Sequence, residues 1–154
     1  MKQDATKADW LIGADLFKKK VKGVALRSMK EPGSAYDDPV IGKDPQPGHM
    51  DDYVKTSSDN GGVHINSGIP NRAFYLTATE IGGRAWEKAG LIWYITLRDR
   101  LREMSTLQDA AKLTYSVAGS LFGKGSSEQK AVANGWKGVG LSARSRRKLG
   151  RMAD

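Results

Sequence analysis

The two histidines are the scarcest candidate catalytic groups of this 154-residue chain, which contains no cysteine. A hydrolytic zinc site on one helix needs two imidazoles one turn apart and a glutamate between them, as in H-E-x-x-H. His49 and His64 do not form this motif, because Met50 and Ile65 follow them. The sequence also lacks G-x-S-x-G, the turn that exposes the serine nucleophile of many hydrolases. We therefore predict no metal site built by this chain alone.

A different segment is suited to stabilise a negative charge. DNGGVHINSGIPNRAFYL, from Asp59 to Leu76, places an acid, two adjacent glycines and His64 just before an expected helix start. Because glycine permits tight turns, Asp59 would reach the His64 ring, fix its orientation and favour the imidazolium form. An imidazolium can donate a hydrogen bond to an oxyanion that develops during a reaction. The alternative is that Asp59 and His64 only brace a loop.

The residues before this motif show no regular structural pattern. Residues 1–65 contain four of the five prolines and no sustained helical or strand period. Turn-forming and acidic residues predominate between residues 31 and 59, and long loops in compact domains are often functional. We predict that residues 1–65 form an irregular N-terminal arm that includes the active-site loop.

From residue 66 onward, apolar residues recur with helical spacing and predict helices over about residues 67–81, 84–101, 105–122 and 126–139. The last two begin with capping-box pairs, Ser105 with Gln108 and Ser126 with Gln129. In the second helix Trp86, Trp93 and Leu97 share one stripe, which predicts the most buried helix, anchored by its two tryptophans. The predicted fold class is all-α, a bundle of about four helices preceded by a long irregular arm.

The net charge of +8 is concentrated in two clusters. The first comprises Lys18–Lys20 and Lys22, and the second lies between residues 144 and 151. We predict that residues 66–141 form the helical bundle and that residues 142–154 form a disordered basic tail. Binding of a polyanion by this tail is an alternative, although the clustering argues against nucleic acid as the main partner.

The sequence also bears on the compartment. No stretch approaches the roughly 20 apolar residues that a membrane span requires, so we expect no membrane partner. The first fifteen residues show no signal-peptide pattern, and both cytoplasmic and secreted locations fit the sequence.

Several segments resemble one enzyme family. DNGGVHINSGIPNRAFYL resembles the active-site histidine motif of thermolysin-like neutral zinc metallopeptidases. Upstream, ALRSMKEP is similar to the arginine motif of that family and DWLIGADLF to the segment before it. Downstream, WEKAGLIWYITLRDRL and GWKGVGL resemble its closing helices, and AYDDPVIGKDPQPGHMDDYV is most similar to the protealysin-like branch. The resemblance covers about residues 9–141 in the order of the family.

The resemblance implies a fold and a set of roles. The chain would be the C-terminal helical domain of the thermolysin fold. His64 would stabilise the tetrahedral intermediate of peptide hydrolysis, and Asp59 would hold the His64 ring. Arg27 would bind a substrate carbonyl through its fork of donors. Leu26 and Leu16 would line the apolar pocket for the residue after the scissile bond.

Two departures from the family limit what the chain can do alone. The H-E-x-x-H helix and the helix with the glutamate ligand precede the matched region in the family, and neither is found here. Leu11 and Ala14 stand where the family has acids that bind calcium, although Asp9 remains. The complete family enzyme would hold zinc, with calcium as a further candidate, whereas this chain alone would hold no cofactor and be inactive.

Two hypotheses about function follow. In the first, the chain is the C-terminal half of a zinc metalloendopeptidase, whose partners are the N-terminal zinc-binding half and a peptide or protein substrate. In the second, it is a stand-alone non-catalytic module that binds a peptide or a protease partner. In either case apolar faces near Leu16, Leu26 and Ile65 would be exposed, so the chain could self-associate.

Overall fold

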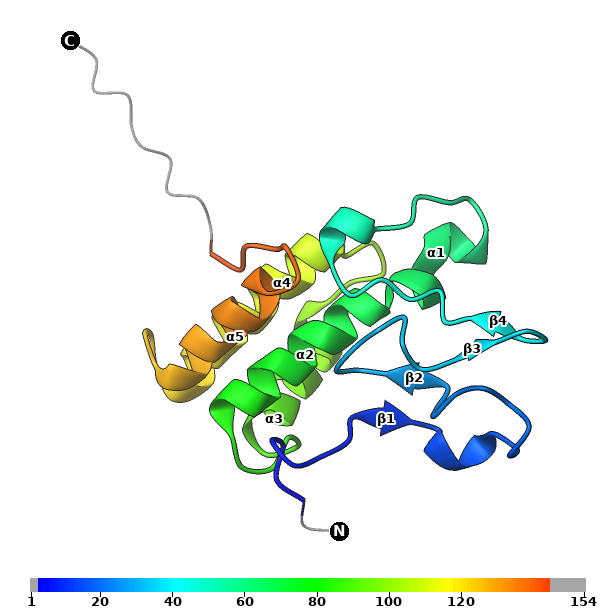
Figure 1. Ribbon diagram of the computed structural model, residues 1–154. Coiled ribbons are helices and arrows are strands. Elements are labelled where there is room, and N and C mark those ends of the chain that lie inside the picture. Colours follow the sequence, from blue (N-terminus) through cyan, green and yellow to red (C-terminus); the bar gives the residue numbers. More distant parts are fainter. Residues whose placement is uncertain (1–2, 145–154) are drawn as a thin grey trace.

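The computed structural model of the protein describes residues 3–144, in which an irregular arm lies along a helical bundle (Figure 1). Two short antiparallel pairs of strands order the arm: β1 (Leu11–Ile12) with β2 (Arg27–Ser28), and β3 (Asp37–Asp38) with β4 (Gly42–Lys43). Single turns of 3-10 helix occur at Ala14–Leu16 and Met50–Asp52. Loops make up most of the remaining arm, as the sequence predicts.

The bundle follows the arm. Its elements are α1 (Asp59–Asn66), α2 (Gly68–Ile81), α3 (Lys88–Ile95), a π-helical turn (Thr96–Arg100), α4 (Leu107–Phe122) and α5 (Ser127–Lys137). In Figure 1, α2 runs through the middle of the molecule, between α5 on one side and the arm on the other. The predicted all-α class with an irregular N-terminal arm is confirmed.

Side-chain caps determine where the last two helices begin. The Ser126 hydroxyl accepts a hydrogen bond from the Gln129 backbone amide, which is one half of the capping box predicted for α5. The other half is absent, because the Gln129 side-chain oxygen accepts from the Gly125 amide. The capping box of α4 lies one residue later than predicted, because Thr106 and Asp109 exchange the two hydrogen bonds. The Ser105 hydroxyl instead accepts from the Arg102 amide and closes the preceding turn. Ser105 is therefore already engaged when the helix begins.

The centre of the core lies where α2 packs against α5. Gly135 permits this close approach, since a Cβ at that position would lie 2.7 Å from the Ala73 carbonyl oxygen. Beside it Trp136 is 1% exposed and donates from its indole nitrogen to the Thr114 hydroxyl at 2.8 Å. The Trp136 ring also stacks on Trp93 at 6.1 Å between ring centroids. An indole that is buried and hydrogen-bonded anchors the core more firmly than burial alone.

The prediction that α3 is the most buried helix, anchored by both of its tryptophans, is wrong. Trp86 is 55% exposed and Leu97 is 69% exposed. The helix begins at Lys88, so Trp86 lies in the turn before it, outside the predicted stripe. The helix then widens into a π-helical turn at Thr96, which changes the rotation per residue and carries Leu97 off the buried face.

The arm contacts the bundle at several places, including one through Trp10 and one through Met50. Trp10 packs edge-on against Phe74 and Tyr75 of α2, at 5.9 and 5.3 Å between ring centroids. The Met50 amide donates to the Val139 carbonyl after α5 at 3.0 Å.

None of the helices within residues 3–144 is both long and apolar enough to cross a membrane. The division at residues 65 and 141 stays a prediction, and most of the predicted basic tail lies outside the described residues.

Candidate functional site

A left-handed turn precedes the histidine of the candidate site. Asp59, Asn60, Gly61 and Gly62 have φ angles of 53°, 48°, 80° and 79°. The amides of both glycines donate to the Ser58 carbonyl, at 3.0 and 2.9 Å. Aspartate, asparagine and glycine are the residues that best tolerate this conformation, so the sequence DNGG suits the turn at every position. Such strained backbone is often retained where it serves a site.

The turn folds the Asp59 carboxylate back over the start of the right-handed helix. One carboxylate oxygen, Oδ2, accepts from the backbone amides of His64 and Ile65, at 2.9 and 3.1 Å. The other, Oδ1, lies 2.5 Å from Nδ1 of the His64 ring. Asp59 thus fixes both the backbone and the imidazole of His64. The contact that the sequence predicts is present, and the catalytic role of the pair stays a prediction.

The exposure of the pair leaves one side of the imidazole available. The His64 side chain is 78% exposed, whereas that of Asp59 is 23% exposed. Nδ1 is engaged by the carboxylate, and Nε2 has no hydrogen-bond partner among residues 3–144. With Nδ1 turned toward the carboxylate, the ring presents its other nitrogen, Nε2, toward solvent. A protonated imidazole would have an N–H donor at that position.

The pKa of Asp59 provides a direct test of this contact. The hydrogen bond from His64 is the main cause that holds the Asp59 pKa below its ordinary value, and backbone amides of Ile65 and His64 add to it against the effect of burial. Because the folded pKa lies below the unfolded pKa of about 3.9, the stabilisation is present above that pH and is lost as pH falls through the folded pKa.

We expect the Asp59 carboxyl carbon to titrate below its ordinary pKa by NMR, and the substitution His64→Ala to raise that pKa. Asp109 is an internal control, since hydrogen bonds from Thr106 cause its lowered pKa. Its titration should not change in the variant. An ordinary pKa for Asp59 in the unmodified chain, or an unchanged one in the variant, would contradict the geometry.

The predicted substrate-binding residues lie on the arm. Arg27 is in β2, opposite Ile12 of β1, and its guanidinium donates to the Leu26 carbonyl at 2.7 Å. Leu16 and Leu26 are exposed and meet above Gly13, where a Cβ would lie 3.0 Å from Cδ1 of each leucine. The structure therefore brings the two leucines together. No contact within residues 3–144 joins Arg27 to His64, and the roles of all three arm residues stay predictions.

Sequence reasoning missed one residue near the pair. Gln46 is buried in the arm, yet its amide nitrogen donates to the His64 carbonyl at 2.8 Å and to the Ser67 hydroxyl at 2.7 Å. The only local signal is its position between two prolines, which indicates a fixed loop and no particular target.

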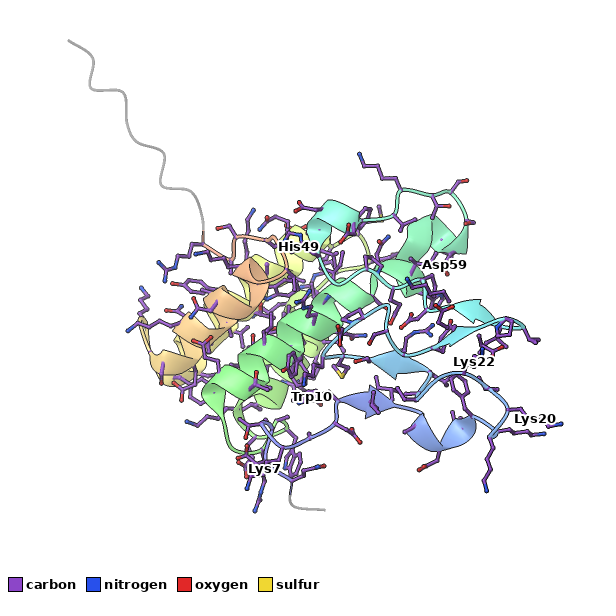
Figure 2. All side chains as sticks on the ribbon, viewed as in Figure 1. Lys7, Trp10, Lys20, Lys22, His49 and Asp59 are labelled. Carbon is purple, nitrogen blue, oxygen red and sulfur yellow. The ribbon has the colours of Figure 1, made fainter. Side chains whose placement is uncertain are left out.

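The donors of the described residues do not fit a zinc site. No group of three or more histidine, aspartate or glutamate side chains gathers within residues 3–144. His64 has Asp59 beside it, while His49 has Asp51 at 3.2 Å. Figure 2 shows His49 and Asp59 on separate parts of the fold. A catalytic zinc ion needs at least three protein ligands, and each pair offers two.

Comparisons with known proteins identify the family to which this site belongs. A family model described as thermolysin metallopeptidase, alpha-helical domain, matches residues 1–141. Protease PrtS of Photorhabdus sp. is 53% identical over 147 residues, which cover 94% of this chain and 39% of that protein. An extracellular metalloprotease of Pectobacterium carotovorum is 50% identical over 143 residues, covering 92% of this chain and 41% of that protein.

A solved structure shows the same likeness. The precursor of protealysin, a metalloproteinase from Serratia proteamaculans, aligns with a TM-score of 0.87 and 54% identity. The alignment covers 92% of this chain and 44% of that one. The chain thus spans less than half the length of these relatives.

Proposed function

The chain belongs to the thermolysin metallopeptidase family, of which it is the alpha-helical domain, and from this premise we propose that it supplies substrate-binding and oxyanion-stabilising groups to a zinc endopeptidase. The zinc site would be held by an N-terminal half, and the substrate would be a peptide or protein. The domain would be inactive without that half, because its own donors do not fit the metal.

One observation carries the proposal: the imidazole of His64 is held by a carboxylate on one side and is open on the other. A peptide carbonyl oxygen gains negative charge as its carbon becomes tetrahedral. A hydrogen bond from Nε2–H of His64 to this oxygen would strengthen as the charge grows, which lowers the barrier. Because Asp59 has already oriented the ring, little reorganisation would be needed.

Arg27 and the two exposed leucines would set the register of the substrate. A guanidinium has five N–H donors. Within residues 3–144 the Arg27 guanidinium makes one hydrogen bond, from Nη1 to the Leu26 carbonyl. The remaining donors can bind a carbonyl of the peptide. Leu16 and Leu26 would cover an apolar side chain next to the scissile bond, since both are exposed and lie together.

Apolar cavities at the surface of the bundle support the proposal that an N-terminal partner binds there. A cavity of about 230 Å³ is lined by Trp93, Leu97 and Pro70, and a second of about 510 Å³ by Pro70, Val63 and Leu107. We propose that the zinc-binding half covers these surfaces. The same surfaces would allow the isolated chain to self-associate. Zinc would come with the N-terminal half, and Leu11 and Ala14 offer no side-chain oxygen for a calcium ion.

The proposal is tested by mixing the chain with zinc and a separately produced N-terminal half of Protease PrtS, the Photorhabdus relative. We expect the mixture to cleave a peptide substrate, while each part alone does not. A covalent fusion of the two parts provides the same test if they associate weakly. A stable complex or a folded fusion that fails to cleave would contradict the proposal and favour the non-catalytic binding module.

A further inference from the structure

Gln46 connects the arm to the backbone of His64. Its amide nitrogen donates to the His64 carbonyl and to the Ser67 hydroxyl, and that hydroxyl also donates to the His64 carbonyl at 2.7 Å. The His64 carbonyl therefore accepts two hydrogen bonds that meet at one point. Gln46 is 3% exposed, so its end of the junction is buried.

The orientation of the Gln46 amide is determined by its surroundings. The His64 carbonyl oxygen can only accept, so the amide nitrogen and not the amide oxygen must face it. Oε1 is buried and has no partner among the described residues. Burying an amide oxygen without a hydrogen-bond partner costs free energy. The two hydrogen bonds that the amide nitrogen donates must therefore offset this cost.

The loop that carries Gln46 is itself fixed. The buried Asp44 carboxylate accepts from the amides of Gly33, Ala35 and Gln46, at 3.1, 3.3 and 3.2 Å. Gly68, at the start of α2, allows the loop to approach, because a Cβ there would lie 2.5 Å from the Pro47 carbonyl oxygen. The arm and the backbone of His64 are thereby joined as one unit.

We infer that Gln46 is a positioning residue for His64, which it holds in register with the arm that carries Arg27. Asp59 orients the imidazole from the N-terminal side, and Gln46 fixes the carbonyl of the same residue from the arm. The effect of Gln46 on catalysis rests on the proposed function. The effect of Gln46 on the backbone of His64 is independent of that function and can be measured on this chain alone.

The substitution Gln46→Met tests the inference, since methionine keeps the volume and unbranched shape but removes the donor. We expect hydrogen exchange of the His64 and Ile65 amides to become about tenfold faster relative to the core amides of α3, as measured by NMR. Gln129→Met is the matched control. Gln129 is also buried and donates to a backbone carbonyl, that of Tyr115 at 3.0 Å, but lies in α5. The control should leave the relative rates unchanged.

If Gln46→Met does not fold, Ser67→Ala removes the hydroxyl at the same junction and should give the same local change on a scale of about two- to fivefold. In the reconstituted peptidase, Gln46→Met should lower kcat about tenfold and leave KM within about twofold, because the transition-state donor is displaced while substrate contacts remain.

Unchanged relative exchange at His64 and Ile65 in both Gln46→Met and Ser67→Ala would overturn the inference, as would an equal change in Gln129→Met. A local change in exchange with kcat unaffected would overturn its catalytic part. Failure of the unmodified chain to reconstitute a peptidase would count against the proposed function, and the exchange rates would still decide the role of Gln46.

Discussion

Replacing His64 with alanine should lower kcat/KM of the reconstituted peptidase by about 10²–10³-fold, the loss typical of removing one donor to an oxyanion. The reduction should be mainly in kcat, because the donor binds the charged oxygen of the transition state more strongly than the neutral carbonyl. Initial rates over a range of peptide concentrations measure both constants.

His49→Ala is the matched control for this substitution. His49 is the other histidine of the chain and also lies beside an aspartate, but it packs against Gly140 after α5. Its removal should change kcat/KM by less than about threefold, as for a surface substitution away from the site. Similar losses in the two variants would show that the assignment of His64 as the donor is wrong.

Replacing Asp59 with alanine should lower kcat/KM by about 10- to 100-fold, which is the usual effect of losing a residue that orients a functional histidine. Two changes contribute: the His64 ring loses its partner at Nδ1, and the amides of His64 and Ile65 lose their acceptor. Asp51→Ala is the control, because Asp51 belongs to the other histidine–aspartate pair.

The double substitution shows whether Asp59 acts through His64. If it does, His64→Ala combined with Asp59→Ala should be about as slow as His64→Ala alone, because groups that act as a unit are not additive. Losses that multiply would indicate that Asp59 has a separate function.

The Asp59–His64 contact could be predicted from the sequence because it is local. The two residues are five positions apart in the chain, and Asn60, Gly61 and Gly62 between them accept the left-handed conformation that brings them together. The family resemblance could also be recognised from the sequence, and it is confirmed by the match over residues 1–141. Its likeness to the protealysin-like branch agrees with the 54% identity to the protealysin precursor.

Other features could not be predicted because they depend on tertiary contacts. Gln46 lies 18 positions from His64 in the chain, and no local pattern reveals which carbonyl its amide meets. The exposure of Trp86 and Leu97 depends on where α3 begins and on a π-helical turn, which apolar periodicity does not encode. The shift of the α4 cap to Thr106 depends on the hydrogen bond that engages Ser105.

In the proposed division of roles, the domain holds an oxyanion donor and the metal belongs to the N-terminal half. Metal analysis of the purified chain, run in parallel with a peptide-cleavage assay on the same sample, distinguishes this division from a self-sufficient enzyme. We predict no stoichiometric zinc and no turnover for the chain alone, and both in the mixture with the N-terminal half. Stoichiometric zinc with turnover in the chain by itself would show that the division of roles is wrong.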